Sequence, residues 1–238
     1  MGGHTAQTPS PPLQNAAFCV SLIHKGNTMN ITIFGASGRT GRLLVQSALN
    51  AGHSVTAFVR DPAKLPVQHV ELKVVQGDTA DAAAVARAVA GADAVISGLG
   101  PVKGSPKDLL VTAQRHITTA MQTAGVRRYV LLTGAGVRDP QDQPKLIDKV
   151  FGFLLKLTAA DVLKDSENGV RLVQATALDW IVVRGPRLTD GPKTGRYRVG
   201  YVGQNSGTQI SRADLADFML EQAVNESDWI RKMPMISW

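Results

Sequence analysis

One stretch near the amino end constrains the fold more than any other, the segment Ile-Thr-Ile-Phe-Gly-Ala-Ser-Gly-Arg-Thr-Gly at residues 31–41. Its first four residues have the composition of a buried strand, and three glycines spaced three apart then lead into an apolar-periodic segment. Gly35 can adopt the dihedrals of a tight turn, Gly38 lets a ligand approach the backbone, and Gly41 lets a helix pack closely on the strand. The sequence therefore predicts strand, tight turn and helix.

The start of this helix predicts an anion site. Its unpaired N–H groups and the positive end of its dipole point into the glycine turn, which favours a diphosphate group. We therefore predict that the turn binds a dinucleotide, the alternative being an ordinary glycine-rich turn. The predicted contacts are Gly35, Ser37, Gly38, Arg39, Thr40 and Gly41.

From Met29 onward, strand-like and helix-like segments alternate, which predicts one α/β domain over residues 29–238 with a doubly wound parallel sheet and helices on both faces. The expected strands are 31–34, 53–59, 70–75, 94–100, 129–136, 180–186 and 233–237, with a hairpin around 197–202. The expected helices are 39–49, 79–89, 108–124, 144–157, 161–175 and 212–224, with Thr79 and Asp81 capping the second and Ser211 and Asp214 capping the last.

Residues 1–28 differ in character, because they carry three prolines and many small polar residues around one short apolar stretch. No basic residues precede that stretch and no small-residue cleavage site follows it, as a signal peptide would require. We interpret these residues as a flexible extension, or as the result of a start assigned upstream of Met29. An export role is the weaker alternative.

Composition limits the classes of partner that the chain can be expected to bind. The net charge is +7, yet the basic residues form no long runs and do not interleave with aromatic residues, so we expect no nucleic-acid partner. No apolar run approaches the roughly 20 residues that span a bilayer, so we expect no membrane partner. The single cysteine fits a reducing cytoplasm, and the five histidines lack metal-ligand spacing, so we expect a cytoplasmic protein without a metal.

The residue at the end of the second expected strand distinguishes an NAD site from an NADP site. A carboxylate there favours NAD, but this chain has Arg60, which would attract the 2′-phosphate of NADP. Arg39, within the glycine turn, can reach the same phosphate. The alternative is that Arg60 pairs with Asp61 or Asp78 at the surface. Asp78 itself is predicted either to lie near the adenine or to cap a helix.

Ligands of a parallel sheet bind at the carboxyl ends of its strands, so the residues that follow each strand are further candidates. These additional candidate cofactor contacts are Leu99, Gly100, Thr133, Gly134 and Pro186.

Six segments together resemble a known family, at 35–41, 59–65, 76–78, 124–130, 178–186 and 210–219. They are similar to the atypical short-chain dehydrogenase/reductases that bind NAD(P)H, of the biliverdin IXβ reductase/flavin reductase type, with the NmrA-like sensors as relatives. The resemblance covers about residues 29–225. It implies a Rossmann-like fold, NADP(H) as cofactor, and hydride transfer to a flavin, a quinone or a similar planar, tetrapyrrole-like acceptor.

The chain departs from that family at two positions that the resemblance would make catalytic. The family has a serine after the fifth strand, where this chain has Gly134 and, beside it, the hydroxyl of Thr133. It has a histidine after the sixth strand, where this chain has Arg187. Arg187 is predicted to hold an acidic acceptor or to stabilise a reduced flavin anion, the alternative being a surface position.

Alcohol-oxidising relatives use a tyrosine, with a lysine four residues later, for proton transfer. This sequence has no such pair. The residues four positions after its three tyrosines are Thr133, Tyr201 and Asn205. Hydride transfer to a planar acceptor needs mainly two rings held in contact. We therefore predict an NADPH-dependent reductase acting as a monomer or homodimer. The alternative is a non-catalytic NADP-binding sensor of the NmrA-like type.

Overall fold

The computed structural model describes residues 28–102, 104–146 and 157–238. Its main sheet has eight strands in the order β3-β2-β1-β4-β5-β6-β10-β8, all parallel except β8, which pairs antiparallel with β10. The strands of this sheet are β1 (Asn30–Phe34), β2 (Ser54–Val59), β3 (Leu72–Gln76), β4 (Ala94–Ser97), β5 (Arg128–Gly134), β6 (Asp179–Gly185), β8 (Arg198–Gly200) and β10 (Met235–Ser237). The predicted doubly wound parallel sheet is confirmed.

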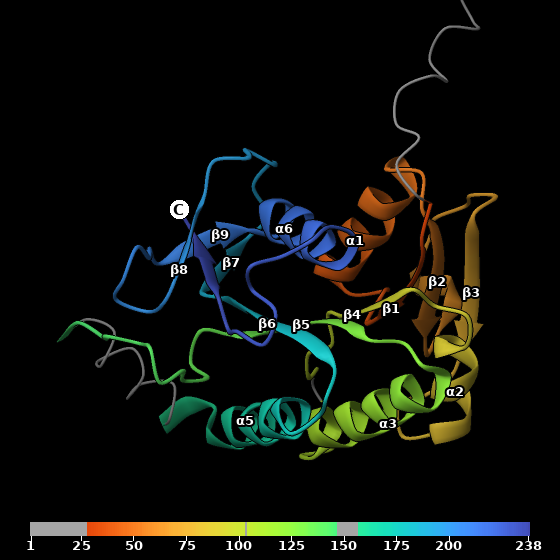
Figure 1. Cartoon of the computed structure of the whole chain (residues 1–238), viewed down its shortest axis with the longest axis horizontal. Helices are drawn as coiled ribbons and strands as arrows, with labels where there is room; N and C mark the ends of the chain where they lie inside the picture. The colour runs from red at the N-terminus through yellow and green to blue at the C-terminus, as the bar shows by residue number, and fades with distance from the viewer. Residues whose placement is uncertain (1–27, 103, 147–156) are drawn as a thin grey trace, which may run out of the picture.

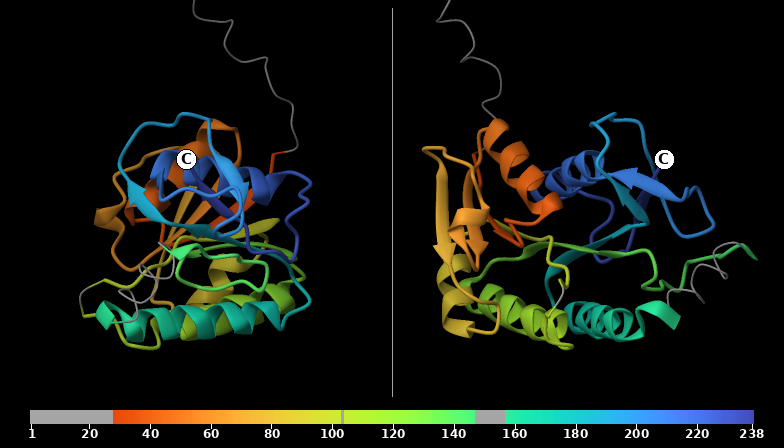
Figure 2. Two further views of the ribbon diagram at one scale, coloured as in Figure 1. Left: turned by 90° about the vertical axis from the view of Figure 1, so that its left-hand side faces the viewer. Right: turned by 180° about the vertical axis from the view of Figure 1, so that it is seen from behind.

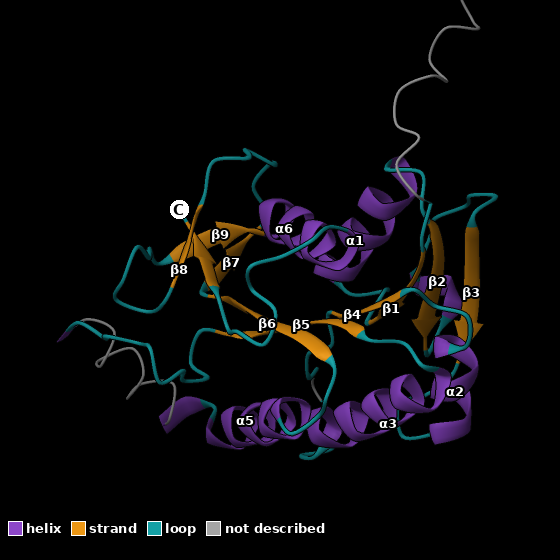
Figure 3. Ribbon diagram, in the orientation of Figure 1, coloured by secondary structure: helices purple, strands orange, loops and turns teal. Residues whose placement is uncertain are grey.

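Helices cover both faces of the sheet, as Figures 1 and 3 show. One layer holds α1 (Arg39–Asn50) and α6 (Arg212–Val224), and the other holds α2 (Ala82–Val89), α3 (Leu109–Ala124) and α5 (Ala160–Gln174). The two further views in Figure 2 show the same three layers. A 3₁₀ turn, η1 (Pro62–Lys64), follows β2, and a small parallel pair of strands, β7 (Arg187–Thr189) and β9 (Gln209–Ser211), lies beside α6.

The core has one apolar cluster on each face of the sheet. Ile31 and Ile33 of β1 belong to the cluster with α1 and α6, whereas Phe34 belongs to the cluster with α2 and α3. Strands buried on both faces are rich in apolar residues, and the one polar side chain of residues 31–34, Thr32, donates to the Ala88 carbonyl at 2.7 Å. Helices therefore cover the central strands on both faces, whereas the edge strand β3 is partly exposed.

Helix ends form largely as the sequence predicts. Asp81 caps α2 by accepting from the N–H groups of Ala83 and Ala84, while Thr79 instead offers its carbonyl to His116. Gly125 ends α3 in the left-handed conformation, with φ of 72°. Ser211 caps α6 by accepting from the N–H of Asp214 at 2.9 Å.

One predicted element is wrong. Residues 197–202 do not form a hairpin, because β8 pairs with β10 at the carboxyl end of the chain, and only a single bridge between Tyr201 and Gln204 follows it. The apolar β10 edge, distant in sequence, offers β8 a longer pairing than its own turn does. The predicted helix 144–157 lies mostly outside the described residues, as does the predicted extension up to residue 27.

Candidate functional site

The glycine turn between β1 and α1 is packed too closely to admit side chains at two positions. Gly35 has a φ of 75°, and a Cβ there would lie 2.9 Å from the backbone of Gly98 and Leu99 at the end of β4. A Cβ at Gly41 would lie 2.0 Å from the carbonyl oxygen of Gly35. The turn is therefore held against both the next strand and the first turn of α1, as a diphosphate-binding turn requires.

The amino end of α1 is open to an anion. Gly38 is the N-cap residue and provides no side-chain hydrogen bond, and the first helical turn contains no acidic residue. Several N–H groups at this end thus lack the side-chain partner that a capping residue supplies. A diphosphate on the turn would satisfy them and would interact favourably with the helix dipole. This bare, glycine-lined cradle fits the phosphates of a dinucleotide.

Arg60 follows β2 at the same edge of the sheet and is exposed. Its two candidate surface partners are engaged elsewhere: Asp61 accepts from Ala63 N–H and pairs with Lys64, and Asp78 accepts from the N–H of Ala80. Among the described residues, no carboxylate lies within ion-pair distance of the Arg60 guanidinium. Arg60 is therefore available for an external anion.

A cavity of about 450 Å³ opens beside the glycine turn, at the carboxyl ends of β4, β5 and β6. The predicted site residues that line it are Gly38, Arg39, Thr40, Leu99, Gly100, Thr133, Gly134 and Pro186. The predicted residues that do not line it are Gly35, Ser37, Gly41, Arg60, Asp78 and Arg187. All of these except Arg187 belong to the glycine turn or to the β2–β3 edge, where the adenosine half of a dinucleotide would lie.

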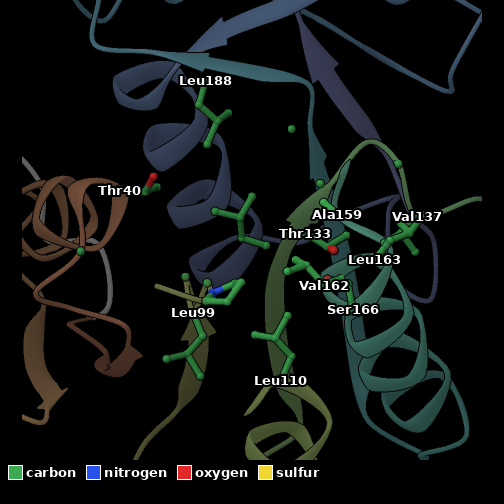
Figure 4. A pocket seen from close by; sticks show the side chains of 18 of the residues that line it. Thr40, Leu99, Leu110, Thr133, Val137, Ala159, Val162, Leu163, Ser166 and Leu188 are labelled. Carbon is green, nitrogen blue, oxygen red and sulfur yellow. The ribbon is translucent and has the colours of Figure 1, made fainter. Parts of the chain in front are cut away.

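The far wall of the cavity comes from α5, and the sequence reasoning missed it. Ala159, Val162, Leu163 and Ser166 line this wall at helical spacing. Figure 4 shows them across the cavity from Thr40 and Leu188. The spacing i, i+3, i+4, i+7 was visible in the sequence, but it also describes a helix packed on a core.

Two hydroxyl groups face the cavity on the side of β5 and α5. Thr133 lies near the end of β5, and Ser166 lies on α5 beside it in Figure 4. The Ser166 hydroxyl donates to the carbonyl of Val162 at 2.8 Å, so its oxygen can still accept. The described cavity thus offers hydroxyls among mainly apolar and glycine neighbours.

Arg212, which was not among the predicted site residues, lines the cavity, whereas the predicted Arg187 does not. Arg187 is exposed on β7, where its N–H donates to the Thr208 carbonyl, and it lies outside the cavity lining although Pro186 and Leu188 belong to it. Arg212, the first residue of α6, lines the cavity instead. Its Nη1 lies 2.6 Å from Oδ1 of Asp190.

A buried ion pair supports the wall after β5. Arg184 and Asp142 form two hydrogen bonds, at 2.8 and 2.9 Å, and their side chains are 0% and 4% exposed. Arg184 also donates to the carbonyls of Met233 and Val137, and Val137 lines the cavity. The pair therefore fixes the loop that follows Thr133.

None of the three tyrosines lines the cavity that the described residues form. Tyr129 is fully buried on β5 with its hydroxyl bonded to Gln114, and this burial raises its pKa. Burial likewise raises the pKa of Tyr197 and Tyr201. A tyrosine phenolate as the proton-transfer group is therefore not part of this site.

Comparison with known proteins agrees with this geometry. The family model described as NAD(P)H-binding matches residues 35–226, so the chain belongs to the NAD(P)H-binding family. The protein YwnB of Bacillus subtilis (strain 168) is 29% identical over 203 residues, which cover 82% of this chain and 92% of YwnB. This chain spans only 30–32% of the length of the next three curated relatives.

Two solved structures share the fold at low identity. A short-chain dehydrogenase/reductase from Veillonella parvula DSM 2008, solved in complex with NADP, has a TM-score of 0.73 at 18% identity over 88% of this chain and 94% of its own. ChuY, an anaerobilin reductase from Escherichia coli O157:H7, has a TM-score of 0.69 at 23% identity over 87% of this chain and 96% of its own. The expected Rossmann-like fold and membership of an NAD(P)H-binding family are confirmed.

Within the described residues, no helix combines the length and apolarity that crossing a membrane needs. The same residues contain no group of three or more side chains placed to hold a metal ion.

Proposed function

We propose that the protein is an NADPH-dependent reductase that transfers hydride to a planar acceptor. One observation carries the proposal: a mainly apolar cavity of about 450 Å³ continues directly from the glycine turn and contains hydroxyls but no tyrosine. Such a cavity suits a flat ring stacked on a nicotinamide better than it suits a sugar or an alcohol. Flavins, quinones and tetrapyrroles are the acceptor classes with this shape.

The proposed cofactor positions follow from the described geometry. The turn at 35–41 would hold the diphosphate, and Arg60 would hold a 2′-phosphate, with Asp78 near the adenine. The residues Leu99, Gly100, Thr133, Gly134 and Pro186 would surround the nicotinamide. The unpaired Arg60 is what favours NADP over NAD, because its guanidinium would otherwise face only solvent.

When bound, the reduced nicotinamide supplies the hydride. The chain itself contributes position and the exclusion of water, since the walls of α5 and β5 hold the acceptor ring against the cofactor. Thr133 can donate a hydrogen bond to a carbonyl or ring nitrogen of the acceptor, Ser166 can accept one from a ring N–H, and the proton can come from water. Arg187 has no part in this scheme because it lies outside the cavity.

Purified protein should oxidise NADPH in the presence of FMN, riboflavin, a soluble quinone or a linear tetrapyrrole, as followed by NADPH absorbance. Tight NADPH binding with no oxidation by any acceptor would contradict the proposal and favour a sensor. The acceptor wall can be tested separately with Val162→Trp, which should fill the cavity and raise the acceptor KM without changing NADPH affinity. Lys164→Trp, on the exposed side of the same helix, is the matched control.

A further inference from the structure

Two arginines that line the cavity, Arg39 and Arg212, contact the same carboxylate, that of Asp190. Oδ1 of Asp190 lies 2.6 Å from Nη1 of Arg212, and Oδ2 of the same carboxylate lies 3.6 Å from Nη1 of Arg39. Arg39 is the first residue of α1, and Arg212 is the first residue of α6, the neighbouring helix in the same layer. One carboxylate therefore lies between two guanidinium groups at the starts of two adjacent helices.

The two arginines have very different surroundings. The side chain of Arg212 is 10% exposed, whereas those of Arg39 and Asp190 are 71% and 70% exposed. Within the described residues, only Nη1 of Arg212 makes a hydrogen bond, and its other nitrogens are not sealed from solvent. Arg212 thus holds a largely desolvated cation at the cavity wall with donors to spare for a ligand.

The position of Arg212 is fixed by the residues around it. Its neighbour Ser211 exchanges two hydrogen bonds with Asp214, at 2.9 and 3.0 Å, and both residues are fully buried. Asp214 also accepts from the N–H groups of Thr194 and Gly195 at 2.7 and 2.8 Å, and from Trp238 Nε1 at 3.0 Å. The same carboxylate therefore anchors the start of α6 and the loop that carries Asp190.

We propose that Arg212 binds the diphosphate of the dinucleotide from the start of α6, beside the glycine turn, and that Asp190 is its resting counter-ion. The carboxylate of Asp190 already marks an anion position between Arg39 and Arg212. The cluster has two cations and one anion, so a net positive charge faces the open end of α1. The contact of Asp190 with Arg39 is exposed and weak, so an incoming phosphate can replace it.

This role differs from that of Arg60 in a way that can be measured. The diphosphate is common to NAD and NADP, whereas the 2′-phosphate belongs to NADP alone. Loss of Arg212 should therefore weaken both cofactors by the same factor. Loss of Asp190 should strengthen both, because the competing carboxylate is removed while the two arginines remain.

The test is calorimetric titration of the full chain with NADP⁺ and with NAD⁺, without any acceptor. Arg212→Gln should weaken both about tenfold or more, as expected for a charge-assisted phosphate contact. Asp190→Asn should tighten both. Arg196→Gln, which removes an exposed arginine of the neighbouring loop that does not line the cavity, should leave both affinities unchanged.

Several results would overturn the inference: unchanged affinities in Arg212→Gln, a loss confined to NADP⁺, or weaker binding in Asp190→Asn. Arg212→Lys, which retains the charge, guards against a folding defect and should recover part of the affinity. A loss of FMN binding relative to riboflavin, at unchanged NADP⁺ affinity, would assign Arg212 to the acceptor and also overturn it. Because only cofactor binding is measured, a protein that reduces no acceptor still tests this inference.

Discussion

The two halves of the sheet are built in different ways. In the half formed by β1 to β4, the site depends on contacts between residues close in sequence, such as the 2.9 Å hydrogen bond from Gly38 N–H to the Gly35 carbonyl. In the half formed by β5, β6, β10 and β8, it depends on contacts between distant residues. Arg184 and Asp142 are 42 positions apart, and Asp142 and Val202 are 60 apart.

The chemistry of these contacts differs as well. The turn at 35–41 is specified by the absence of side chains, because a Cβ at Gly41 has no space. The loops of the second half are held by buried carboxylates. Asp142 pairs with Arg184, and Asp214 forms hydrogen bonds at the start of α6. Burial alone would raise the pKa of Asp214, but the hydrogen bonds from Gly195 and Thr194 together lower it.

Under the proposed function, the first half would hold the cofactor and the second half would hold the acceptor. The glycine turn tolerates few substitutions at its glycines, and the group it would bind, a diphosphate, is the same in every dinucleotide. A loop held by an ion pair can be lengthened or reshaped, provided that its anchoring carboxylate keeps its partners. We infer that acceptor choice in this protein resides in the loops that Asp142 and Asp214 hold.

The largest expected effect is that of Asp142→Ala. It would leave the fully buried Arg184 without its counter-ion, and breaking such a pair costs about 3–5 kcal/mol of unfolding free energy. Urea unfolding would measure it. The double variant Arg184→Met with Asp142→Leu should recover much of the loss, because no buried charge remains. A double variant as unstable as Asp142→Ala would show that the loops need the ion pair itself.

The next effect is that of Gly41→Ala. The added methyl would meet the Gly35 carbonyl at 2.0 Å, so the turn must shift, at a cost of about 1–3 kcal/mol. We expect lower stability in urea together with weaker NADPH binding. Gly100→Ala is the matched control for stability alone, because nothing lies within 4 Å of its Cβ position. Equal losses of stability in both variants would contradict the steric account of the turn.

The first half of the sheet was largely predictable because its signals are local. The strand, the three glycines and the helix of residues 31–49 follow one another without interruption. The same holds for the cap of α6, where Ser211 and Asp214 are three residues apart. Sequence spacing is sufficient to predict a contact when its two residues lie within one turn of each other along the chain.

The second half was not predictable to the same degree. No spacing links Asp142 to Arg184, or β8 to β10, and both contacts form only once the chain has folded. The sequence analysis named Arg187 and not Arg212 as a site residue, which shows the same limit at the site. Alternation along β7 directs Pro186 and Leu188 to the cavity and leaves Arg187 outside, but that short strand forms only by pairing with β9.

A smaller effect is expected at the β2 edge. Arg60→Ala should weaken NADPH about tenfold, corresponding to roughly 1.4 kcal/mol, and leave NADH little changed, because only NADPH carries the 2′-phosphate. Fluorescence titration with each cofactor would measure this. Arg87→Ala, at an exposed position of α2, is the control for general loss of positive charge. An equal loss for NADPH and NADH would refute the role of Arg60.

The smallest effect concerns the amino ends of β5 and β6, opposite the site, where Arg127 donates to Asp179 at 3.0 and 3.2 Å. The hydrogen bond from Arg127 lowers the pKa of Asp179, so the pair stabilises the fold above the ordinary pKa of an aspartate. That contribution is lost as the pH falls through the lowered pKa. Arg127→Ala should therefore shift the urea midpoint slightly at neutral pH and not at all in strong acid. High salt should also remove the difference, because the arginine is exposed. A shift of the urea midpoint at neutral pH as large as that of Asp142→Ala would contradict this comparison, because the exposed ion pair would then contribute as much stability as the buried one.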